Sequence, residues 1–126
     1  MGDRPALSKG EMEIARLLWD LKEASVREVH EAVPEDRRIE FTVVQTYLRR
    51  LESKGYVVSR LEGRTKIYRP KIKPKTVIRE TVDDLVDRLF GGEKLPLVQH
   101  LIEDRDLSDG DIQQLRELLD RMEDRS

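Results

Sequence analysis

The sequence predicts a mainly α-helical protein with one small β-hairpin and a further group of helices after it. Helical spacing of apolar residues fills most of the 126-residue chain, and one short stretch rich in β-branched and aromatic residues interrupts it. A turn sequence at Gly63-Arg64 divides that stretch into two strands. Hydrophobic residues make up only 37% of the chain and charged residues 40%, so a small core is expected.

Three helices are expected before the hairpin. Ser8 precedes "KGEMEIARLLWDLK" and Ser25 precedes "VREVHEAV", and each serine has a glutamate three positions later, as in a capping box. The third helix, "TVVQTYLRRLESKG", is expected to start at Thr42, with Gln45 completing another capping box, and to end at Gly55.

The strands of the hairpin are "YVVSRLE" and "TKIYRPK", and Pro70 and Pro74 end this part of the chain. Three helices joined by short connections and followed by a hairpin form the order of a winged helix-turn-helix, which we predict for residues 1–73. A lone hairpin is marginally stable in water, so it is expected to lean on the helices.

Residues 74–126 are predicted to form a helical dimerisation arm. Their apolar stripes are too small for a separate monomeric core, so burial against a second copy of the chain is expected. The alternative is that these helices fold back on their own N-terminal domain. The residues expected to mediate dimerisation are Ile78, Val82, Leu85, Leu89, Val98, Leu101, Ile112, Leu115 and Leu119.

The charge of the chain is unevenly distributed. The net charge is −2, but residues 1–72 hold 15 basic and 12 acidic side chains, whereas residues 73–126 hold 9 and 14. Within residues 45–75 ten basic side chains stand against two acidic ones. A local basic block of this kind indicates a phosphate-binding surface, and a merely solvated charged hairpin is the alternative.

The third helix has one packing face and one polar face. At about 100° per residue, Val44, Tyr47, Leu48 and Leu51 fall on one side, and the polar residues fall on the other. Arginine, glutamine and threonine suit base edges in the major groove of DNA, and a valine methyl can touch thymine. The predicted DNA-binding residues are Thr42, Val43, Gln45, Thr46, Arg49 and Arg50 on this helix, and Arg60, Arg64 and Lys66 on the hairpin.

Other functional classes find little support. The chain has no cysteine, which excludes thiol catalysis and disulfides, and its two histidines lack the spacing of a zinc site. His30 lies on an apolar face and is expected to be a core residue. No phosphate cradle or activated nucleophile is visible, so we expect neither an enzyme nor a bound cofactor or metal. No apolar run could span a membrane, so a cytosolic location without membrane insertion is expected.

The chain resembles the BlaI/MecI/CopY family of bacterial penicillinase repressors. The stretches that carry this resemblance are "LSKGEMEIARLLWDL", "SVREVHEAVPEDR", "FTVVQTYLRRLESKGYV", "EGRTKIYRPK", "LVDRLFGG" and "LVQHLIEDRDLSDGDIQQLRELL". The resemblance implies a homodimeric winged-helix repressor that binds double-stranded DNA at a dyad operator over a promoter. The alternative function is a winged-helix protein-interaction module without an operator.

The resemblance also implies how repression ends. In β-lactam-responsive members a membrane metalloprotease sensor triggers cleavage within the dimerisation arm. The corresponding bond in this chain is His100–Leu101, where the known sites of the family have Asn-Phe. The copper-responsive branch uses C-terminal cysteines, which this chain lacks.

Overall fold

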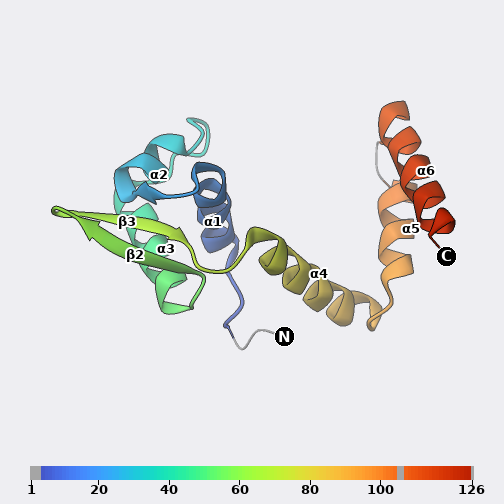
Figure 1. Ribbon diagram of the computed structural model, residues 1–126, viewed down its shortest axis with the longest axis horizontal. Helices are drawn as coiled ribbons and strands as arrows, with labels where there is room; N and C mark the ends of the chain where they lie inside the picture. The colour runs from blue at the N-terminus through green and yellow to red at the C-terminus, as the bar shows by residue number, and fades with distance from the viewer. Residues whose placement is uncertain (1–3, 105–106, 126) are drawn as a thin grey trace. The chain divides into compact units, whose positions relative to one another are not determined.

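The computed structural model describes residues 4–104 and 107–125, and it confirms the predicted fold class (Figure 1). The chain divides into two compact units, residues 1–82 and 83–126. The elements are α1 (Lys9–Leu21), β1 (Ala24–Ser25), α2 (Val26–Ala32), α3 (Phe41–Ser53), β2 (Val57–Glu62), β3 (Thr65–Pro70), α4 (Pro74–Phe90), α5 (Lys94–Asp104) and α6 (Asp109–Asp124).

The first unit combines three helices with a three-stranded antiparallel sheet. The strand order is β1-β3-β2, and the predicted hairpin forms β2 and β3. β1 was not predicted, because two residues directly before a helix show no alternation of apolar and polar side chains. In Figure 1 the tip of the hairpin extends past the helices of this unit.

The core of this unit is shared by all three helices and the sheet. Tyr68 of β3 and Val57 of β2 are almost fully buried, so the hairpin is anchored by packing and not only by its turn. The buried residues contributed by the helices and β1 are Ile14, Ala15, Leu18, Ala24, Val29, Val44, Leu48 and Leu51.

Helix starts follow the predicted caps at Ser8 and Ser25 and depart from the prediction at the third helix. The capping boxes at Ser8, Ser25 and Ser108 are present, each with both hydrogen bonds. The predicted start of the third helix at Thr42 is wrong. The carbonyl of Glu40 accepts hydrogen bonds from the amides of the third and fourth residues after it, so α3 begins at Phe41 without a side-chain cap.

The first turns of α4 belong to the first unit. Val77 is buried, and Arg4 forms an ion pair with Glu80 at 2.5 Å. These contacts explain why the boundary between the units lies at residues 82 and 83, inside α4, whereas the predicted domain boundary lies at the start of that helix.

The second unit has almost no core of its own. Among its described residues, Val86 alone is buried. Leu115 is half-buried, whereas the other apolar residues predicted to mediate dimerisation, including Ile78 and Val82 at the end of the first unit, are exposed. Apolar stripes left in water to this extent are typical of interaction surfaces.

Gly10 tests the packing between α1 and α3. A Cβ at this position would lie 2.5–2.8 Å from the ring of Tyr47. Alanine stabilises a helix interior by about 1 kcal/mol relative to glycine, but overpacking costs about 1–3 kcal/mol. We therefore expect Gly10→Ala to lower the free energy of unfolding, measured by urea denaturation.

The control for this prediction is Tyr47→Ala, which removes the ring that the new methyl group would meet. In that background Gly10→Ala should be neutral or stabilising, because only the helix propensity remains. Stabilisation by Gly10→Ala in the otherwise native chain would contradict the close approach of the two helices.

Candidate nucleic-acid interface

Burial of one side of α3 turns its polar side outward. Val44, Leu48 and Leu51 have no exposed surface. Thr46 is half-buried, and its hydroxyl donates a hydrogen bond to the carbonyl of Thr42 at 2.9 Å. The other predicted DNA-binding residues of this helix are exposed, namely Thr42, Val43, Gln45, Arg49 and Arg50.

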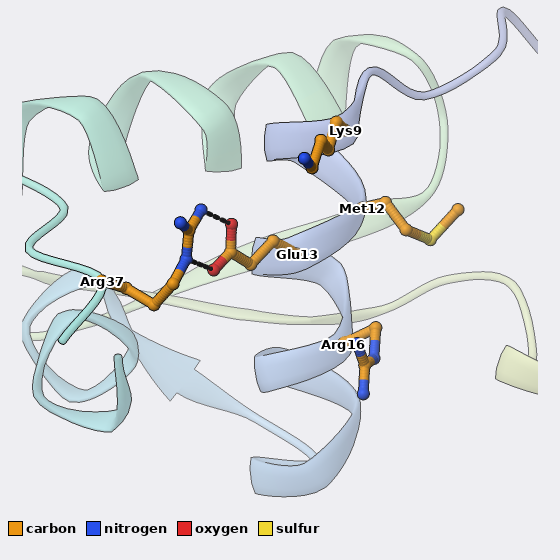
Figure 2. Close-up of a pocket in the computed structure, with 5 residues that line it drawn as sticks. All are labelled: Lys9, Met12, Glu13, Arg16 and Arg37. Atoms are coloured by element: carbon orange, nitrogen blue, oxygen red, sulfur yellow. Dashed lines mark hydrogen bonds and ion pairs between the residues drawn. The ribbon is translucent and has the colours of Figure 1, made fainter. Parts of the chain in front are cut away.

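The connector that leads into α3 is tied to α1 and α2. Figure 2 shows Arg37 of this connector facing Glu13 of α1, with two hydrogen bonds of 2.6 Å between guanidinium and carboxylate. This contact lowers the pKa of Glu13 and raises that of Arg37. His30 of α2 forms a hydrogen bond of 2.9 Å with the carbonyl of Ile39. The N-terminal end of α3 is therefore held from two sides.

A nearly buried ion pair holds the other end of α3. The carboxylate of Glu11 accepts a hydrogen bond from Lys54 at 2.6 Å and another from the amide of Ser8 at 2.9 Å. Burial raises the pKa of Glu11, but these hydrogen bonds outweigh it and leave that pKa lowered. Lys54 also donates to the carbonyl of Ala6 at 3.0 Å. The C-terminal end of α3 is thus fastened to the start of α1.

The hairpin of β2 and β3, here called the wing (residues 57–70), is fastened to α3 through Glu52. The hydroxyl of Ser59 on β2 donates to this carboxylate at 2.6 Å, and Lys66 on β3 lies 3.1 Å from it. The hydrogen bond from Ser59 and the contact with Lys66 lower the pKa of Glu52. Glu52 therefore joins α3 to both strands of the wing.

The three predicted DNA-binding cations of the wing differ in their surroundings. Arg60 binds Glu23 at 2.8 Å and also binds Glu62, and Lys66 binds Glu52. Arg64, in the turn, has no ion-pair partner within residues 4–104 and 107–125. Acids of the chain itself therefore already offset two of the three cationic charges.

The remaining cations of the basic block lie elsewhere. Lys71, Lys73 and Arg69 line a shallow depression together with Trp19 of α1 and Lys22, which follows that helix. The structure thus divides the basic block of residues 45–75 between α3, the wing tip and this depression. Sequence analysis could not separate them, because the partners of Arg60 and Lys66 are distant or depend on the strand register.

Several residues that position α3 and the wing, or that lie at the start of α3, were not predicted as such from the sequence. Glu11, Glu13, Arg37 and Glu52 position α3 and the wing, but ion pairs between distant segments leave no local pattern in a single sequence. Phe41 is 42% exposed at the first position of α3, where its ring lies edge-on to His30. Phe41 lay outside the helix predicted to start at Thr42. The helix starts one residue earlier, because its first hydrogen bonds go to the carbonyl of Glu40.

Sites of other chemistry do not emerge from the described residues. No group of three histidine, aspartate or glutamate side chains within them is placed to hold a metal ion. The helices of the described part of the chain are too short or too polar to cross a bilayer.

The first unit is a winged helix in which α3 turns its polar face outward. The model of the penicillinase repressor family matches residues 7–121. The chain belongs to this family. Its members are transcriptional repressors that bind DNA and are not enzymes.

Individual relatives agree with this assignment. The penicillinase repressor of Bacillus licheniformis is 26% identical over 121 residues, which cover 96% of this chain and 94% of that protein. The methicillin resistance regulatory protein MecI of Mammaliicoccus sciuri is 24% identical over 115 residues, covering 91% and 94%. The solution structure of the DNA-binding domain of the repressor BlaI matches with a TM-score of 0.52 and 28% identity, covering 59% of this chain and 90% of that domain.

Proposed function

We propose that this chain is a homodimeric, sequence-specific repressor that places α3 in the major groove of a dyad operator. The observation that carries the proposal is an exposed row of hydrogen-bond donors on a helix whose two ends are fastened to α1. An α-helix fits the major groove, and its N-terminal residues usually approach the base edges. Rigid attachment supports recognition, because small displacements would misalign the donors.

The proposed contacts follow from position along α3. Thr42, Val43, Gln45 and Thr46 lie in the first two turns and are assigned to bases or their immediate surroundings. Arg49 and Arg50 lie farther along and are assigned to a base edge or a phosphate. Arg64 of the wing is assigned to the phosphate backbone, whereas Arg60 and Lys66 can bind phosphate only by leaving the acids that now hold them.

Dimerisation through residues 74–126 is supported by the lack of a core in the second unit. Exposed leucines at positions 85, 89, 101 and 119 gain free energy by burial against a second copy. A dimer places two α3 helices on two half-sites, and simultaneous binding multiplies the affinity. The DNA-binding domain is assigned to residues 1–73 and the dimerisation domain to residues 74–126, with the first turns of α4 packed on the former.

Derepression would follow from separation of the dimer. The bond between His100 and Leu101, which the family resemblance assigns to a membrane sensor protease, lies inside α5. Both residues are exposed, but a helical bond must unwind locally before a protease can cut it. Loss of the dimer by any route would lower operator affinity, so the proposal does not depend on proteolysis.

Substitutions on α3 test the DNA-binding proposal. We expect Arg49→Ala and Thr46→Ala to weaken binding to the DNA upstream of the chain's own gene by about tenfold. Arg49→Ala removes hydrogen-bond donors from the outward side of α3. Thr46→Ala removes a methyl group and a hydroxyl oxygen that can still accept, because its proton is donated to Thr42. Electrophoretic mobility shift with specific and scrambled duplexes measures the loss of affinity.

The matched control for these variants is Arg16→Ala, which removes an exposed arginine from α1. It should retain native affinity and sequence preference. If Arg49→Ala and Thr46→Ala fold and bind as the native chain does, the assignment of α3 is wrong. Binding that is insensitive to salt would favour a protein-interaction module, since DNA binding weakens steeply with salt.

Substitutions in the arm test dimerisation. Leu85→Asp and Leu119→Asp should yield monomers in sedimentation velocity, because each places a charge in the proposed interface. Operator affinity should fall by about a hundredfold as the second half-site contact is lost. Leu119 is 59% exposed and Leu85 41% exposed within the chain, so a circular dichroism melt of each variant checks that the protomer remains folded.

The control for the arm is Gln114→Asp, which adds the same charge at an exposed polar position of α6. This variant should remain dimeric. A dimer of native stability for both leucine variants would contradict the proposed interface.

A further inference from the structure

The register of the wing separates its two faces. Ser59 pairs with Tyr68, and Leu61 pairs with Lys66. Side chains alternate along a strand, so these four residues lie on one face of the hairpin. Tyr68 is buried in the core, and Ser59 and Lys66 both contact Glu52 of α3. This face is therefore the α3 side of the wing.

Leu61 is the outermost apolar residue on the α3 side of the wing. Its side chain is 70% exposed, more than any other large apolar side chain in the part of the chain that the structure describes. It lies two residues beyond Ser59, and therefore beyond the wing's hydrogen bond to Glu52. A leucine in this position contributes little to the fold, because most of its surface remains in water.

The charges around Leu61 do not account for it. Arg60 projects from the opposite face and is held by Glu23 and Glu62. Lys66, directly across from Leu61, is held by Glu52. The α3 side of the wing therefore presents an apolar side chain next to Lys66, which is already paired, and the unpaired Arg64 lies beyond it in the turn.

We infer that Leu61 is an apolar contact with duplex DNA, packed against deoxyribose carbons of the minor groove beside the segment bound by α3. The inference rests on the proposed function, because it requires α3 to lie on the duplex. Proteins that enter the minor groove use apolar side chains against sugars and base steps. Continuity with the outward face of α3 makes DNA the occupant that fits this position.

Glu52 is a positioning residue for this contact. Its bonds to Ser59 and Lys66 hold the α3 side of the wing at the C-terminal end of α3, so they fix where Leu61 meets the duplex. Removing a negative charge near DNA would by itself strengthen binding. A positioning role predicts the opposite, because a loosened wing no longer presents Leu61.

The experiment measures the affinity of the full chain for the same upstream duplex by fluorescence anisotropy over a series of salt concentrations. Leu61→Ala should weaken binding by about fivefold at every salt concentration, with an unchanged slope of log affinity against log salt. Arg64→Ala should weaken binding and reduce the magnitude of that slope by about one. The difference in slope separates an apolar contact from an ionic one.

The second arm of the experiment tests the role of Glu52. Glu52→Gln should weaken binding by about threefold, whereas Glu62→Gln, which removes an acid from the same hairpin, should not weaken it. In the Glu52→Gln background, Leu61→Ala should cost less than in the native chain, because the two residues act together. Circular dichroism melts of all variants verify that each remains folded.

The outcomes separate this inference from the proposed function. If the native chain shows no specific binding, the proposed function fails. If the native chain binds, Arg49→Ala binds about tenfold more weakly, and Leu61→Ala binds with native affinity, the inference about Leu61 fails alone. Tighter binding by Glu52→Gln would overturn its positioning role.

Discussion

Burial of one side of α3 is the constraint on which the rest of the structure depends. Val44, Leu48 and Leu51 are fully buried against the core that Ile14 and Leu18 of α1 also form. Rotating α3 about its axis would expose these side chains, and each would lose about 1.5–3 kcal/mol of burial free energy. The direction of the polar face is therefore set by the core and not by its own side chains.

The ion pairs refine what the core determines. Packing fixes the rotation of α3, but polar contacts at its two ends fix how it is joined to α1 and to the wing. Most of these pairs are partly exposed and contribute modestly to stability. Their value lies in holding α1, α3 and the wing in one arrangement. Glu11 is the exception, because its carboxylate is nearly buried and Lys54 and Ser8 offset the cost of burying its charge.

The sequence predicted the elements well and the contacts between them poorly. Helices with a strong apolar period and a serine cap were located correctly, because both signals are local. The start of α3 was misplaced, because no side chain caps its first amides and the sequence therefore carries no cap signal at Glu40. β1 is too short to carry a pattern, and the partners of Arg37, Lys54 and Lys66 depend on the tertiary fold. The outward face of α3 was predictable because burial follows helical periodicity.

We propose that the outward face of α3 binds DNA, with the wing beside it. Nuclear magnetic resonance titration of the full chain with its upstream duplex tests this claim directly, residue by residue. The amide signals of residues 42–50 and 61–65 are expected to shift or broaden first. Perturbation confined to α4, α5 and α6, with residues 42–50 unchanged by the duplex, would contradict this claim.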